Sequence, residues 1–163
     1  MVDFSQSQWS LSCMFNATYG ALQKLEDTLA DVTQFYSSNR LDDRIIYTDW
    51  NAHHVLAHLV SWHMSFARNL ASAVSGTPAQ PFKGKLSDIN EREVLVLLPL
   101  PIPELLEKLQ DAQSYIRSNI LNPQVTLIAY KQGSRPYSPE EHLMVVNKHI
   151  SQHLEDVKRR YRS

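Results

Sequence analysis

Seven histidines and a single cysteine, Cys13, are the residues of this chain whose types and spacing bear most directly on chemistry. His149 and His153 stand four residues apart near the C-terminus, and His54 and His58 stand four residues apart earlier in the chain. On a helix this spacing places two imidazole rings one turn apart on the same face, close enough to share one metal ion. One cysteine excludes both an intrachain disulfide and a cysteine-rich zinc site. A metal bound by this chain would therefore be held by imidazole and carboxylate groups.

The angular position of each histidine relative to the apolar stripe of its helix separates stronger candidates from weaker ones. At about 100° per residue, His149 and His153 lie roughly 60–100° from the centre of their stripe, and His58 lies about 80–90° from the centre of its own. His54 lies further from the centre of that stripe, at about 125°. His142 lies two turns before His149 on the same face of its helix. A histidine at a stripe edge can line a pocket between helices, but it is more often solvated or hydrogen-bonded within the protein. Spacing alone leaves both roles open.

Four long segments with apolar residues at intervals of three and four predict the helices that would carry these side chains. The first is expected from about Phe15 to Ser37, and the second from an N-cap at Asp49 to a break at residues 75–78. The third begins near Pro103 and stops before Asn122. The apolar stripe of the first helix consists of Leu22, Leu25, Leu29, Val32 and Tyr36.

The last helix has the clearest predicted start. Ser138 can cap the amide of Glu141 while the Glu141 side chain reaches back, and the proline between them suits a first helical turn. Between the long helices, residues Asp88 to Leu98 are expected to form a short helix. Residues Gln124 to Tyr137 are expected to form a loop with a short extended piece at 125–128.

Length and composition favour one all-α domain over residues 1–163. Four long amphipathic helices pack most simply as a four-helix bundle, here with a connection of roughly 25 residues between the second and third. Sixteen basic and 17 acidic side chains give a net charge of -1, so no basic surface for nucleic acid is expected. The N-terminus lacks the pattern of a signal peptide, and the most apolar stretch is too short to span a bilayer. A cytoplasmic protein that binds neither nucleic acid nor membrane is expected.

Several of these segments together resemble the DinB/YfiT-like superfamily. The stretch from Trp50 to Trp62 is similar to its second-helix signature, in which a tryptophan precedes the helix and a His-Leu pair, here at His58, follows about eight residues later. Residues 149–153 resemble its last-helix HxxxH motif, and residues 88–94 its short intervening helix. The resemblance spans roughly Asp49 to Arg160. It implies an up-down-down-up bundle, often a homodimer, that binds nickel or zinc; the metal ligands implied are His58, His149 and His153.

The segment from Tyr130 to His142 is similar to one branch of this superfamily, the ClbS/DfsB group, which includes proteins that hydrolyse the cyclopropane of a reactive genotoxin. That branch does not always keep the second-helix histidine, which this chain has at His58. The resemblance therefore supports two different interpretations. One is a metal-binding protein of the main superfamily, and the other is a metal-independent hydrolase or sequestering protein.

Three histidine ligands would leave at least one coordination position open, as at a catalytic zinc site. That position could activate water or hold the thiolate of a small thiol, as several DinB-like enzymes do. His54 and His142 are the nearest candidates for a base or an outer hydrogen-bond partner, and Trp50 and Trp62 are candidates to line the pocket. The first hypothesis is a metal-dependent enzyme that acts on a small electrophile by thiol transfer or hydrolysis, in detoxification or stress response. The alternatives are the ClbS-like protein and a non-enzymatic helical dimer.

Overall fold

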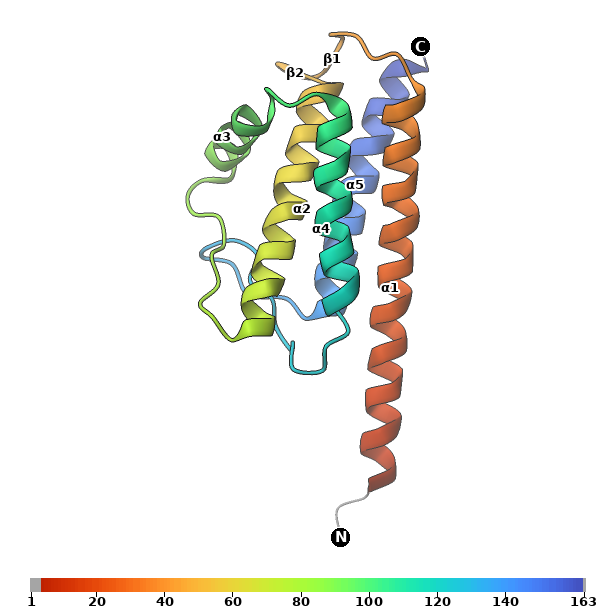
Figure 1. The fold of residues 1–163 in the computed structure, drawn as a ribbon, viewed down its shortest axis with the longest axis vertical. Helices are drawn as coiled ribbons and strands as arrows, with labels where there is room; N and C mark the ends of the chain where they lie inside the picture. Colours follow the sequence, from red (N-terminus) through yellow and green to blue (C-terminus); the bar gives the residue numbers. More distant parts are fainter. Residues whose placement is uncertain (1–3, 163) are drawn as a thin grey trace.

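The computed structural model describes residues 4–162 of the chain, with side chains described from residue 12 onward. Figure 1 shows the long helices side by side, with a short helix beside one of them and a small hairpin at one end. The long helices are α1 (Phe4–Ser38), α2 (Ala52–Ser75), α4 (Ile102–Asn119) and α5 (Pro139–Tyr161), the short helix is α3 (Leu86–Leu97), and the antiparallel strands are β1 (Ile45–Tyr47) and β2 (Trp50–Asn51).

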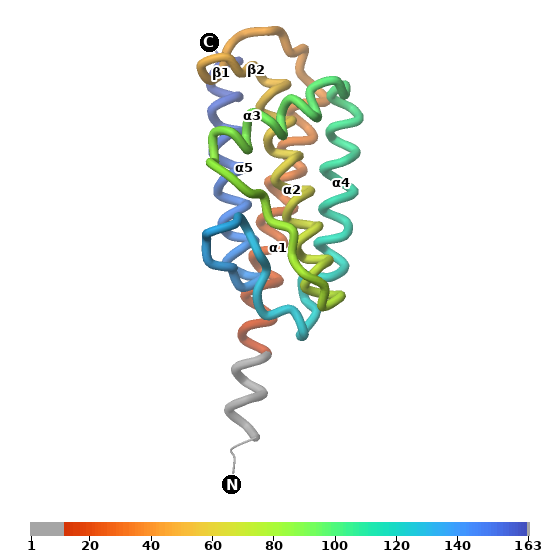
Figure 2. Tube along the Cα trace, turned by 90° about the vertical axis from the view of Figure 1, so that its left-hand side faces the viewer, coloured from red at the N-terminus to blue at the C-terminus, as the bar shows by residue number. Residues whose placement is uncertain are grey.

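The directions of the helices confirm the predicted up-down-down-up bundle. In Figure 1, α1 runs upward, α2 and α4 both run downward, and α5 runs upward. Two consecutive long helices can point the same way only if the chain returns between them, and residues 76–101 make this return. Figure 2 shows that this segment runs back along the outside of the bundle. It includes α3, which packs on α2.

The core is formed by the apolar stripes of the long helices, with α2 packed mainly on α4 and α1 mainly on α5. The predicted stripe of α1 is confirmed, since all five of its residues are buried. α2 differs from the other helices because it is buried around most of its circumference. Its polar side chains are therefore buried as well; these are His58, Ser61, His63, Ser65, Asn69 and Ser72.

The predicted start of the second helix was wrong by two residues. Asn51, not Asp49, is the N-cap: its backbone is extended, and its side-chain oxygen accepts a hydrogen bond from the amide of His54 at 3.1 Å. Asp49 lies instead in the turn between β1 and β2, next to Thr48, whose φ is 22°. Both residue types cap helices well. The hairpin decides between them, because it keeps the chain extended up to Asn51.

Other boundaries also differ from the predictions. α1 begins at Phe4, eleven residues before the expected Phe15. α4 ends at Asn119, in agreement with the predicted stop before Asn122. The predicted extended piece at 125–128 forms only an isolated bridge, between Ile128 and Tyr137. Among residues 4–162, no helix combines the length and apolar character needed to cross a membrane.

The capping box predicted at the start of α5 is present. The Ser138 hydroxyl accepts a hydrogen bond from the Glu141 amide at 3.3 Å, and the Glu141 carboxylate accepts one from the Ser138 amide at 3.0 Å. Arg135 pairs with the same carboxylate at 3.0 Å and lowers the pKa of Glu141 to about 2, with further help from the Ser138 amide. The box thus fixes the first turn of the helix that carries His149 and His153.

We expect Ser138→Ala to lower the free energy of unfolding by about 1 kcal/mol, because it removes the acceptor of an otherwise unpaired helix amide. Urea unfolding followed by circular dichroism measures the change. Ser118→Ala is a matched control in α4, where the exposed hydroxyl donates to the Ser114 carbonyl, and it should be neutral or slightly stabilising. Equal effects of the two variants would contradict a special role of the cap.

Candidate metal centre

The ring nitrogens of three histidines converge between α2 and α5. His58 comes from α2, and His149 and His153 come from successive turns of α5. The Nε2 atom of His149 lies 3.0 Å from the Nε2 atom of His58 and 3.0 Å from that of His153. One ligand atom from each residue can be chosen so that all three lie within 4.8 Å of one another. The structure therefore brings together the three histidines that the family resemblance implied.

Tyr47 and Asp156 determine which nitrogen of His153 faces the other two histidines. The Tyr47 hydroxyl lies 2.8 Å from Nδ1 of His153 and donates its single hydrogen to the Asp156 carboxylate at 2.6 Å. Burial, followed by the hydrogen bond to Asp156, raises the pKa of Tyr47, so the phenol keeps that hydrogen. The hydroxyl can therefore only accept from His153, which places the imidazole hydrogen on Nδ1. The Nε2 atom of His153 is left with its lone pair directed at His149.

This arrangement suits a cation better than it suits hydrogen bonds alone. A contact between two imidazoles needs a hydrogen on one nitrogen and a lone pair on the other. His149 Nε2 has two such contacts, and one hydrogen cannot serve both well. A zinc ion bound at about 2.0–2.1 Å would place neighbouring ligand nitrogens roughly 3.3 Å apart. The observed 3.0 Å separations are close to this value, so the donor set fits a divalent metal.

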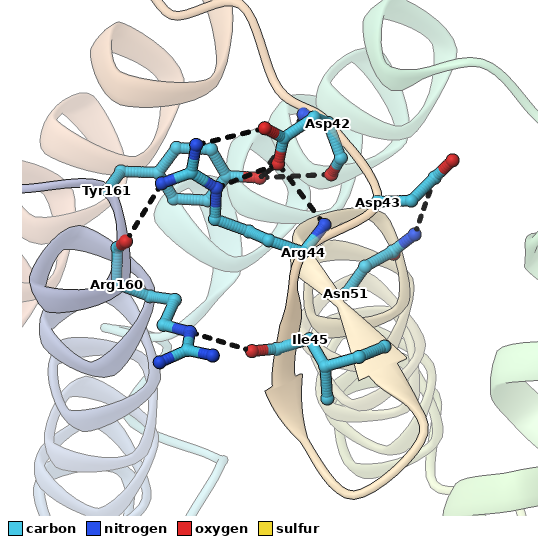
Figure 3. A network of polar contacts seen from close by, with 7 residues as sticks. All are labelled: Asp42, Asp43, Arg44, Ile45, Asn51, Arg160 and Tyr161. Carbon is cyan, nitrogen blue, oxygen red and sulfur yellow. Dashed lines mark hydrogen bonds and ion pairs between the residues drawn. The ribbon is translucent and has the colours of Figure 1, made fainter. Parts of the chain in front are cut away.

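The hairpin that carries Tyr47 is tied to the end of α5 by the network in Figure 3. Arg44 pairs with Asp42 at 2.8 Å, donates to the Arg160 carbonyl at 3.1 Å, and stacks over the Tyr161 ring at 4.4 Å. Arg160 in turn donates to the Ile45 carbonyl at 3.1 Å. Each exposed contact contributes little alone, but together they hold β1 beside α5 and so place Tyr47 against His153.

Burial keeps the three histidines neutral at physiological pH. It lowers the pKa of His58 to about 3, with smaller contributions from His149 and His153, and it lowers the pKa of His149 to about 4, with a smaller contribution from His153. Burial also lowers the pKa of His153, although Asp156 opposes the change. Neutral imidazoles present lone pairs, which is the protonation state that metal binding requires.

The depressed pKa values predict that acid destabilises the metal-free protein. The folded-state pKa values of His63, His142 and His149 are about 4, below the ordinary 6.5, so the unfolded chain binds more protons between these limits. The free energy of unfolding is therefore highest above about pH 6.5 and falls as the pH is lowered toward 4. Each of these histidines contributes a loss of about 1.4 kcal/mol for each unit by which its pKa is lowered. Urea unfolding in chelator at pH 7 and pH 5 measures the loss. His142→Phe should flatten this dependence, and an equal dependence in that variant would contradict the assignment.

The other residues predicted for the pocket divide into two groups. The Trp50 ring lies 5.2 Å from the His58 ring and so forms part of the wall around it. The His54 ring instead donates from Nδ1 to the Asn51 side chain at 2.7 Å, at the capped end of α2. The structure thus brings Trp50 to the three histidines and places His54 on the N-cap.

Trp62 and His142 lie together at a cavity that also reaches His149. Both line a small cavity of about 20 Å³ between α2, α5 and the loop that precedes α5, and His149 forms part of the same lining. Trp62 is held by a hydrogen bond from its indole to Asn90 at 2.9 Å and by stacking on Tyr130. This cavity therefore connects two of the predicted pocket residues with one of the three converging histidines.

Sequence reasoning did not identify Tyr47, Asp156 or His63. Asp156 follows His153 by three residues and shares its helix face, which is a signal that could have been used. Tyr47 lies more than one hundred residues from His153 on a three-residue strand, and no local pattern connects the two.

Comparisons with known proteins find similarity in fold. No protein-family model matches the chain, and no curated protein sequence matches it. A solved structure described as "Crystal structure of the mycothiol-dependent maleylpyruvate isomerase" is similar, with a TM-score of 0.59 and 12% sequence identity. The similar region covers 90% of this chain and 60% of the isomerase chain, so this chain spans about three fifths of that protein. The chain thus shares its helical fold with a thiol-dependent enzyme.

Proposed function

We propose that this protein binds one divalent metal ion through His58, His149 and His153 and catalyses the reaction of a low-molecular-weight thiol with a small electrophile. The observation that carries the proposal is the convergence of three neutral imidazole nitrogens from two helices. Within the described part of the chain, no cysteine, aspartate or glutamate joins them as a fourth ligand. Three protein ligands with an open position are the arrangement of a catalytic site rather than a structural one.

The ion would supply Lewis-acid chemistry, favouring the deprotonated form of a water or thiol that occupies the open position. Nickel and zinc both accept imidazole ligands, so the donor set fits either metal. The protein's own contribution is to hold the nitrogens in place. His58 is almost fully buried against Trp50, and His153 is oriented by Tyr47 and Asp156.

A thiol is preferred over water as the nucleophile because the isomerase of similar fold is mycothiol-dependent by description. A thiol that adds to an electrophile can be released again, as in an isomerisation, or can stay attached, as in a transfer. Hydrolysis at the same centre remains the alternative when water takes the open position. A ClbS-like activity would differ from both, since it would not need the three histidines to bind metal.

Elemental analysis of the protein, expressed without a histidine tag, tests the metal site. We expect about one equivalent of nickel or zinc per chain. The activity is tested by mixing metal-loaded and chelated protein with a small thiol and a panel of small unsaturated electrophiles, and following the loss of free thiol. Thiol consumption only in the loaded sample supports the proposal. Equal turnover after chelation would instead favour the metal-independent alternative, and no binding with excess metal would overturn the proposal.

A further inference from the structure

A second pair of buried imidazoles lies beside the three converging histidines and is not explained by them. His63 is 0% exposed and His142 is 2% exposed. Both line the cavity of about 20 Å³ whose wall also includes His149. In each ring the Nδ1 atom is buried and has no hydrogen-bond partner among the described residues. Two buried, unpartnered nitrogens at one cavity are unusual, since such groups are nearly always satisfied by protein or by water.

The hydrogen-bond partners of His63 determine what its free nitrogen can accept. Nε2 of His63 lies 2.9 Å from the Gln113 side-chain oxygen, and the Gln113 side-chain nitrogen faces Glu26 at 3.5 Å. Because the oxygen of Gln113 only accepts, Nε2 of His63 must carry the imidazole hydrogen. The buried Nδ1 atom of His63 therefore has a lone pair and requires a hydrogen-bond donor.

His142 is fixed in place by aromatic contacts instead. Its ring stacks on Phe66 with a centroid separation of 4.0 Å and an interplanar angle of 6°, and Tyr130 and Tyr137 meet it edge-on. These contacts prevent the ring from turning toward solvent to satisfy Nδ1. A partner for this nitrogen must therefore come to the ring.

We infer that the cavity is a binding site for one ordered water molecule, which donates to Nδ1 of His63 and is hydrogen-bonded to Nδ1 of His142. A volume of about 20 Å³ exceeds the 10–15 Å³ that one water requires. Ser65 and Asn69 add polar groups to the lining. The Ser65 hydroxyl accepts from Arg68 at 3.3 Å and from Asn69 at 3.4 Å, so its hydrogen remains available to a water.

A neutral ligand fits this cavity better than an ion does. Burial lowers the pKa of both His63 and His142 to about 4, so neither ring carries a charge that would attract an anion. The water would hydrogen-bond to both rings beside His149, and its binding does not depend on a bound metal. Its presence can therefore be tested separately from the proposed function.

A high-resolution crystal structure of the full chain, grown with chelator, tests the inference directly. We expect a density peak within about 2.7–3.2 Å of both Nδ1 atoms. An empty cavity in that map overturns the inference, whatever the variants described next show.

Thermal unfolding of variants gives a second, independent measurement. His142→Phe keeps the stack on Phe66 but removes the nitrogen. If a water is bound, this variant and His63→Leu should each lower Tm. The double variant should then be more stable than the sum of the two single effects predicts, because the water leaves with its last partner. With a dry cavity, His142→Phe should raise Tm and the effects of the two variants should add; His63→Leu lowers Tm in either case, because it also removes the hydrogen bond to Gln113. Tyr36→Phe, at the hydrogen bond to the Ala52 carbonyl, is a distant control whose effect should add to that of His142→Phe.

Discussion

Replacing His149 with alanine is expected to abolish specific metal binding. Its Nε2 atom is the one that lies 3.0 Å from both of the other ligand nitrogens, so its loss leaves two nitrogens on different helices. The affinity should fall by more than the roughly 10–100-fold that follows the loss of an outer hydrogen-bond partner. Metal titration against a competing chelator measures the change. The wild type should gain about 2.7 kcal/mol of stability at a free metal concentration of 100 times Kd, and the variant should gain none.

The metal-free variant should remain folded, because His149 is only half-buried and its removal relieves a crowded contact between imidazole nitrogens. Loss of metal can therefore be separated from loss of structure. His53→Ala is the matched control: this half-buried histidine of α2 contacts the Leu100 carbonyl at 2.8 Å, away from the site. It should retain full metal content. Unchanged affinity in His149→Ala would show that the three histidines are not the metal site.

Local sequence patterns were sufficient to predict the bundle. The spacing of Leu22, Leu25 and Leu29 marks the buried face of α1, and the Ser138 capping box marks the start of α5. Both signals depend on residues within two turns of one another. The hairpin before α2 could not be predicted in this way, because its strands have only three and two residues and its stability depends on contacts with the distant end of α5.

All three converging histidines were predicted from the sequence, but on different grounds. The His149 and His153 pair follows from helical spacing, whereas His58 was preferred to His54 because it lies nearer the apolar stripe of its helix and matches the family signature. In the structure, α2 is covered on most sides, so His58 is buried, while His54 is half-buried in the first turn and bonds to the N-cap. His63 was not singled out, because nothing in the sequence shows that Gln113, on another helix, faces it.

Tyr47→Phe is expected to weaken metal binding by about 10–100-fold with little change in fold, which is the usual effect of removing an outer partner of a metal-binding histidine. The variant loses only the hydroxyl that accepts from Nδ1 of His153 and donates to Asp156. Without this acceptor, the imidazole hydrogen of His153 is no longer held on Nδ1. Part of the population then carries it on Nε2, where it blocks the lone pair directed at the metal.

Two measurements distinguish this positioning role of Tyr47 from a general loss of structure. Nitrogen NMR of the metal-free protein should show His153 mainly with its hydrogen on Nδ1 in the wild type and as a mixture of tautomers in Tyr47→Phe. Tyr130→Phe, which removes the hydroxyl of a half-buried tyrosine stacked on Trp62, should leave both the tautomer and the metal affinity unchanged. If Tyr47→Phe kept the wild-type tautomer but bound metal more weakly, the hydroxyl would act by another route. If Tyr47→Phe kept both the wild-type tautomer and the wild-type metal affinity, the hairpin would not affect metal binding. The network around Arg44 would then only stabilise the bundle.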